Sequence, residues 1–120
     1  MVLVTSNKRR RLLCLNYIKQ VVPAELASAR EDLKVLLAEL PPGFRLLVDL
    51  SQVEFMDQEC AVEIGRSMDQ IRVAGVGLIV RVIPDASKDI GMSILSVFHY
   101  PHELTVLTCA TLAQALERLA

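Results

Sequence analysis

Residues 44–57 read FRLLVDLSQVEFMD and decide the fold of this chain. The first half, from Phe44 to Leu50, is an almost unbroken apolar run, which is typical of a strand covered on both faces and therefore of a parallel sheet. Asp49 interrupts this run. It could belong to a ligand site, because open α/β sheets bind ligands beyond the carboxyl ends of their strands. We favour a structural role, in which Asp49 accepts backbone hydrogen bonds from a following loop at 51–57.

Outward from this strand, hydrophobic patterns predict further strands alternating with helices. An amphipathic helix starts at Pro23 and ends at the Pro41-Pro42-Gly43 stop, and Asp57 can cap the next helix, which ends near Gly75. The expected order is ββαβαβαβα, which gives an α/β fold with a mostly parallel sheet of about five strands and helices packed on it. The predicted strands lie at 2–4, 11–18, 44–50, 76–83 and 104–109, and the third and fourth helices begin at Ile90 and Thr111.

Length and composition indicate one soluble domain over residues 1–120. The 120-residue chain is 52% hydrophobic with a formal charge of -1, so it should fold and has no net field to attract nucleic acid or a membrane surface. Its apolar runs are shorter than the roughly 20 residues that span a bilayer. Residues 8–18 begin like a signal peptide, but Asn16 and Lys19 cut the apolar part short. Three widely spaced cysteines suggest reduced thiols and a cytoplasmic protein.

The segment from Leu46 to Asp57 resembles the central strand and following loop of STAS domains, the anti-sigma factor antagonists. Their pattern is a hydrophobic strand, Asp-Leu-Ser, and then Phe-Met/Ile-Asp-Ser-Ser-Gly; residues 49–51 and 55–57 match it. Residues 81–91 (RVIPDASKDIG) and 98–100 (FHY) resemble more specifically a SpoIIAA-like branch described as STAS/SEC14. The resemblance in element order covers most of the chain and implies the STAS fold.

The resemblance also points to a functional position at the start of the second helix. In the sporulation-type antagonists a kinase phosphorylates the second Ser of Asp-Ser-Ser-Gly, and Glu59 stands at that position here. Glu59 either stabilises the helix N-terminus through the helix dipole, which we favour, or mimics a permanently phosphorylated state. We expect an interaction surface with Gln58, Glu59, Glu63 and Arg66 on one exposed face beside Asp57. The opposite face should bury Cys60, Ala61, Ile64, Met68 and Ile71.

A second hypothesis concerns residues 90–98, which carry apolar side chains on more than one side of a short predicted helix. This helix is either buried in the ordinary way or leaves apolar surface for a partner or a ligand. In the ligand case the protein is a carrier or sensor of a small apolar molecule, as the STAS/SEC14 resemblance implies. The pocket would then be lined by Ile90, Ile94, Leu95 and Phe98.

Catalytic and metal sites have weak support in the sequence. His99, His102 and Cys109 are the candidates, but Pro101 prevents a regular helical pair of histidines. Common nucleotide-binding and hydrolase motifs are missing. We therefore expect no enzyme activity, no metal and no cofactor. The expected role is a regulatory or interaction module that self-associates or binds another protein, and the basic run 8–11 is interpreted as edge protection or plain solvation.

Overall fold

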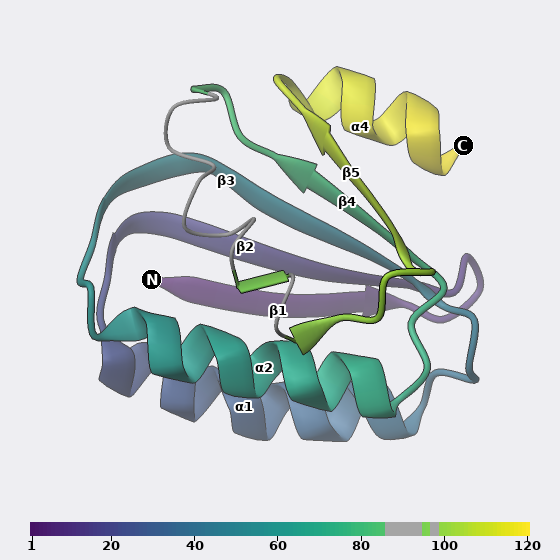
Figure 1. Cartoon of the computed structure of the whole chain (residues 1–120), viewed down its shortest axis with the longest axis horizontal. Helices are drawn as coiled ribbons and strands as arrows, with labels where there is room; N and C mark the ends of the chain where they lie inside the picture. The colour runs from purple at the N-terminus through teal and green to yellow at the C-terminus, as the bar shows by residue number, and fades with distance from the viewer. Residues whose placement is uncertain (86–94, 97–98) are drawn as a thin grey trace.

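Five strands form one sheet in sequence order: β1 (Val2–Asn7), β2 (Leu12–Val21), β3 (Arg45–Met56), β4 (Leu78–Val82) and β5 (Thr105–Cys109). The computed structural model describes residues 1–85, 95–96 and 99–120. β1 is antiparallel to β2, and the other neighbours are parallel. The helices α1 (Pro23–Ala38) and α2 (Cys60–Val73) pack on one face, and α4 (Leu112–Leu119) packs on the other (Figure 1). The predicted α/β fold class is confirmed.

The third predicted helix falls mostly outside the residues that the structure describes. Ile90, Ile94 and Phe98 all belong to the part that is not described. Leu95 and Ser96 are described and helical, and Leu95 is partly buried against the core formed with α1 and α2.

β3 is buried on both faces, as its apolar run predicted. Leu46 and Val48 join the larger core beneath α1 and α2, whereas Leu47 joins the smaller core beneath α4. All three side chains are buried. Successive side chains of a strand point to opposite faces, so a strand between two helical layers needs apolar residues at consecutive positions.

β3 extends further than the sequence predicted. The segment from Ser51 to Met56, predicted as a loop, continues the strand and pairs with β2 as far as Val21. Two register shifts accompany this pairing, and Lys19 adopts a φ of 57° beside one of them. Within the described residues, β4 pairs with β3 only over Arg45–Asp49, so the second half of β3 projects past β4. Exposed polar residues in this second half, such as Ser51, Gln52 and Glu54, explain why the sequence pattern predicted a loop there.

Two α2 residues differ from their predicted exposure, because of how α2 packs against the sheet and α1. Ala61, predicted to be in the core, is exposed, because the buried stripe runs along Cys60, Ile64, Met68 and Ile71. Glu63, predicted on the solvent face, has a side chain only 14% exposed. It lies between the helices, where Oε2 is 2.9 Å from Nε of Arg30 on α1.

The basic run at 8–11 fastens the β1–β2 hairpin to the end of α1 and the start of β3. Lys8 Nζ lies 3.1 Å from a carboxylate oxygen of Glu39, and Arg11 donates to the carbonyl of Pro42. Arg45 donates to the carbonyls of Arg10 and Leu119, which joins the hairpin to α4. Lys8 and Arg11 are therefore not simply solvated, as one of the two interpretations had it, but contact other elements.

The His99 ring packs closely against α2 at Gly65, which has no side chain. Its Nδ1 lies 2.8 Å from Oδ1 of Asp69. A Cβ atom built at Gly65 would lie 2.6 Å from His99 Nε2, closer than real contacts allow. Glycine at this position therefore lets the ring approach the helix backbone.

We expect Gly65→Ala to destabilise the protein by about 1–3 kcal/mol, because the new methyl group overlaps the His99 ring. In a His99→Ala background the same change should become neutral or stabilising, since alanine is preferred to glycine in a helix by about 1 kcal/mol. Chemical denaturation of the four proteins measures the coupling as a double-mutant cycle. Equal costs in both backgrounds would contradict the contact.

Candidate functional site

The candidate site residues fall at two places: Asp49 within β3, and the turn where β3 ends and α2 begins. Asp49, near the end of the β3–β4 pairing, is buried, and its Oδ1 accepts hydrogen bonds from Ser51 N at 2.9 Å and Ser51 Oγ at 2.6 Å. The favoured structural role is thus present, although the donor belongs to the continued strand and not to a loop. These bonds pair the buried Asp49 carboxylate with the first residue of β3 that is predicted as loop.

The turn from Asp57 to Cys60 connects β3 with α2. Asp57 Oδ1 accepts a hydrogen bond from Glu59 N at 3.1 Å, and the Asp57 carbonyl accepts one from Cys60 N at 3.0 Å. Asp57 N donates to Val21 O at 3.4 Å, which attaches the turn to the end of β2. Asp57 was expected to cap α2 itself. It instead caps the turn before α2, because its acceptor binds the N–H of Glu59, the N-cap residue of the helix.

Gln58 and Glu59 are the exposed side chains of this turn. Glu59 occupies the N-cap position of α2, and among the described residues its side chain makes no capping hydrogen bond. Glu59 lies at the N-terminal end of α2, where the helix dipole favours a negative charge. The N–H of Glu59 is itself bonded to Asp57.

The five predicted interaction residues do not form one uniform exposed face. Asp57, Gln58 and Glu59 share the turn, and the exposed Arg66 lies further along α2. Glu63 is largely buried between the helices and holds Arg66 in place, with 3.0 Å between Glu63 Oε1 and Arg66 Nη1. It acts as a support for this surface.

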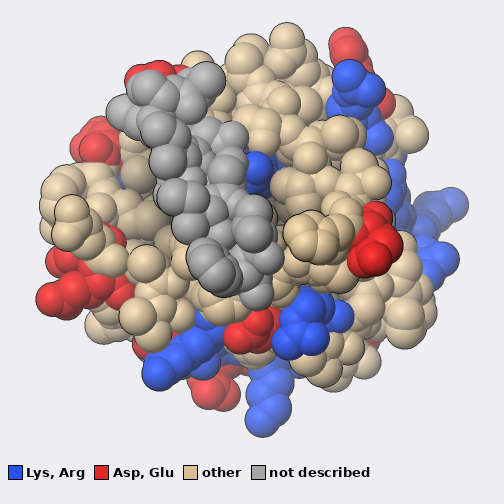
Figure 2. Space-filling model, in the orientation of Figure 1, with Lys and Arg blue, Asp and Glu red and all other residues tan. Residues whose placement is uncertain are grey.

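Acidic groups surround Cys60 beneath the turn. Cys60 is fully buried, and its Sγ lies 3.4 Å from Val21 O. Burial raises the pKa of the Cys60 thiol, and the negative charges of Asp57, Glu25 and Glu59 raise it further. Figure 2 shows acidic side chains gathered toward the left, where α2 begins, and basic side chains toward the right, near the β1–β2 hairpin. The negative charges at this end of the molecule disfavour a thiolate at Cys60.

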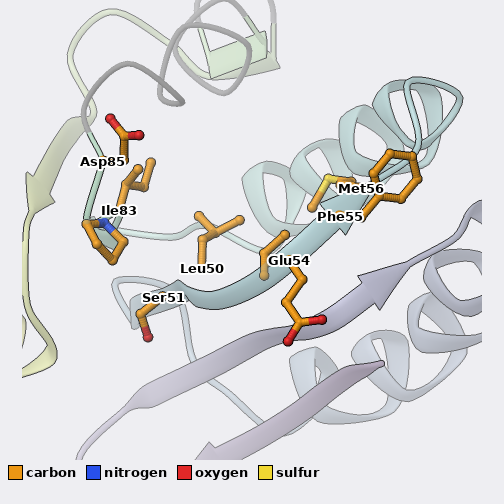
Figure 3. Close-up of a pocket in the computed structure, with 9 residues that line it drawn as sticks. Leu50, Ser51, Glu54, Phe55, Met56, Ile83 and Asp85 are labelled. Carbon is orange, nitrogen blue, oxygen red and sulfur yellow. The ribbon is translucent and has the colours of Figure 1, made fainter.

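A pocket of about 360 Å³ opens beside the part of β3 that projects past β4. Most of its described lining residues are apolar, and Ser51, Glu54 and Asp85 are the polar ones (Figure 3). No local sequence pattern indicates this pocket, because it arises where Pro84 follows the end of β4 while β3 continues. The apolar lining residues are Leu50, Val53, Phe55, Met56, Ile83 and Pro84.

The residues considered for metal or thiol chemistry lie apart. His99 contacts Asp69 on α2, Cys109 is buried beneath α4, and His102 is exposed in the segment before β5. Within residues 1–85, 95–96 and 99–120, no group of three or more His, Cys, Asp or Glu side chains could hold a metal ion. No helix in these ranges is long and apolar enough to cross a membrane.

Known structures share this fold at low sequence identity. An uncharacterized protein from Shewanella loihica with a SpoIIAA-like fold matches with a TM-score of 0.70 and 10% identity, over 100% of this chain and 93% of the other. The Bacillus cell fate determinant SpoIIAA in its phosphorylated form matches with a TM-score of 0.64 and 13% identity, over 100% of both chains. An anti-sigma factor antagonist from Mycobacterium paratuberculosis matches with a TM-score of 0.60 and 18% identity, over 99% of this chain and 92% of the other.

No family model and no curated protein matches the chain. The structural likeness therefore establishes the SpoIIAA-like fold that the sequence resemblance implied.

We expect Asp57→Ala to destabilise the protein by about 1 kcal/mol, because the N–H of Glu59 loses its acceptor at the entry to α2. Asp57→Asn should retain most of the stability, since its side-chain oxygen can still accept that bond. Gln58→Ala, at the exposed neighbouring position, is the matched control and should stay within about 0.5 kcal/mol of the wild type. Urea denaturation measures all three, and an unchanged stability of Asp57→Ala would refute the capping role.

Proposed function

We propose that this protein is a non-catalytic regulatory module that binds another protein through the Asp57–Cys60 turn and the exposed side of α2. The observation that carries the proposal is the exposed carboxylate of Glu59 at the start of α2, on a fold shared with anti-sigma factor antagonists. The surrounding acidic side chains support a partner that presents lysine or arginine there. Arg66, held by Glu63, would contact an acid of the same partner.

The state of the reactive side chains supports binding over catalysis. Asp49 accepts two hydrogen bonds from Ser51, and the Cys60 thiol is buried with a raised pKa. His99 contacts Asp69 and is packed on Gly65. A general base or a nucleophile needs access to substrate, and each of these groups is instead committed to holding the fold.

Glu59 gives the proposed surface a permanent charge. A phosphoserine carries about -1.5 to -2 charges near neutral pH, so a single carboxylate imitates it only in sign. We propose that recognition here is constitutive and does not await a kinase. The three free cysteines support placing the protein, as a single domain of residues 1–120, in the cytoplasm.

Replacement of one carboxylate tests the partner surface. We expect Glu59→Gln, which keeps the side-chain shape and removes the charge, to weaken partner binding by about tenfold, as loss of a charge-assisted contact does. Glu59→Ser should weaken it as well. Glu117→Gln, at an exposed position of α4, is the matched control and should bind as the wild type does.

The measurement is quantitative affinity capture from the host with each variant as bait, followed by titration of the purified partner. A partner that binds Glu59→Gln and the wild type equally would remove Glu59 from the recognition surface. It would also end the idea that this position imitates a phosphate.

A second candidate function is the carriage of a small apolar molecule, and the 360 Å³ pocket beside β3 favours it. Its volume falls within the range of small-molecule sites, and its walls are mainly apolar. The described lining is separate from the pocket predicted at Ile90, Ile94, Leu95 and Phe98, of which only Leu95 belongs to the described residues. Glu54 and Asp85, which are among the lining residues of the pocket beside β3, would favour a ligand that is neutral or cationic.

Native mass spectrometry of the protein purified gently from its host tests carriage. A carrier should show an extra small-molecule mass that denaturation removes, and Leu50→Trp should abolish it by filling the pocket. Val62→Trp, at a position 61% exposed on α2, should retain it. A wild-type protein without added mass, or a ligand that persists in Leu50→Trp, would count against this pocket.

A further inference from the structure

The outer edge of β1 is open in the part of the chain that the structure describes. β1 is the first strand of the sheet and pairs with β2 (Figure 1). Sheet edges are commonly protected by charges, prolines or bulges, because unpaired backbone groups can join another chain. Residues 2–7 read VLVTSN, with neither a charge nor a proline, and the β1–β2 register is unbroken. The nearby Lys8 and Arg11 lie beyond the strand and are held elsewhere.

Hydrogen bonds at the start of β1 determine which backbone groups face outward. Met1 N donates to Ile18 O at 2.9 Å, and Ile18 N donates back to Met1 O at 2.8 Å. Opposite residues in an antiparallel pair alternate between such doubly bonded pairs and pairs without hydrogen bonds. By the register of the two strands, the residues bonded to β2 are Leu3, Thr5 and Asn7. The residues whose N–H and C=O groups point outward are Val2, Val4 and Ser6.

These outward groups make β1 complementary to itself. They occur at every second residue and are centred on Val4. A two-fold axis at Val4 therefore places Val4 opposite its own copy and Val2 opposite Ser6 of the partner subunit. Each opposed pair is of the doubly bonded kind, so every outward N–H and C=O group finds an acceptor or donor.

Side chains along this edge leave room for a second strand. Leu3 is 45% exposed, and α4 packs on β3, β4 and β5, away from β1. In the self-paired arrangement Leu3 faces Thr5 of the partner subunit at a non-hydrogen-bonded position, where cross-strand side chains come closest. On the other face, a hollow of about 350 Å³ lies between the start of β1 and α1. Small side chains of α1 contribute to it: Ala24, Ser28 and Ala29.

We propose that two copies of this protein join through antiparallel β1 strands, so that their sheets form one continuous sheet across a two-fold axis. The contact goes beyond the proposed function, because it uses none of the side chains from Asp57 to Glu59. The occupant is a second copy of this chain, because two-fold pairing about Val4 gives every outward N–H and C=O group of both strands a partner without any other protein. An isologous contact of this kind closes as a dimer, whereas pairing of β1 with β5 of another copy would produce open chains.

Amide hydrogen exchange tests the contact in the wild-type protein. Residue-resolved exchange is measured at low and high protein concentration, with sedimentation reporting the dimer fraction. The amide of Val4 should slow by about tenfold or more as the dimer forms. Thr5, whose amide is already bonded to β2, is the internal comparison and should change much less. A dimer in which Val4 exchange does not change, or a monomer at every concentration, would overturn the proposal.

A matched pair of variants tests the same contact independently. Ser6→Pro removes an outward N–H, which an edge strand tolerates when that group faces solvent. It should raise the dimer dissociation constant by about tenfold or more, whereas Ser6→Ala keeps the N–H and should match the wild type. A folded Ser6→Pro protein that dimerises normally would refute the contact, and so would open-ended polymers. If Ser6→Pro does not fold, the exchange experiment decides. Partner capture through Glu59 should persist in a monomeric Ser6→Pro protein, which separates this proposal from the proposed function.

Discussion

The burial of β3 on both faces is the constraint on which the other elements depend. Leu46 and Val48 need a cover on one side and Leu47 needs one on the other, so a sheet with a helix layer on only one face would leave apolar surface in water. α1 and α2 supply the first cover, and α4 supplies the second. Arg45, at the start of the same strand, then connects the hairpin with α4 through backbone carbonyls. Packing and polar contacts thus converge on one strand.

Residue periodicity suffices to predict the described strands and helices. The helices bury one stripe each, and the central strands β3 and β4 bury consecutive residues on both faces, and both patterns are visible in the sequence. Periodicity does not predict the length of β3. Ser51 and Gln52 have the character of a loop, yet β2 continues alongside them, and the length of a partner strand is not written in the strand itself. Glu63 is a similar case, because Arg30, which draws it between the helices, belongs to another element. The pocket beside Leu50 depends on a difference in length between two strands, which no local pattern records.

The winding of the sheet also bears on function. Doubly wound sheets bind ligands where the strand order reverses, but here the order follows the chain from β1 to β5 without a reversal. The crevice that such a reversal would open is therefore not built into the topology. The hollow beside β3 has a different origin, the early end of β4, and the start of α2 stands next to it as a firm, charged projection.

The agreement between strand order and chain order has a consequence for synthesis on the ribosome. Each new parallel strand pairs with the strand that emerged before it, so the growing chain can extend its sheet at one border without opening pairs already made. The crossing segments keep the loops to be closed short compared with a fold that returns to its first strand. The contact from Arg45 to the carbonyl of Leu119 forms only when the last helix arrives. It therefore joins the start of β3 to a helix that emerges after all the described strands.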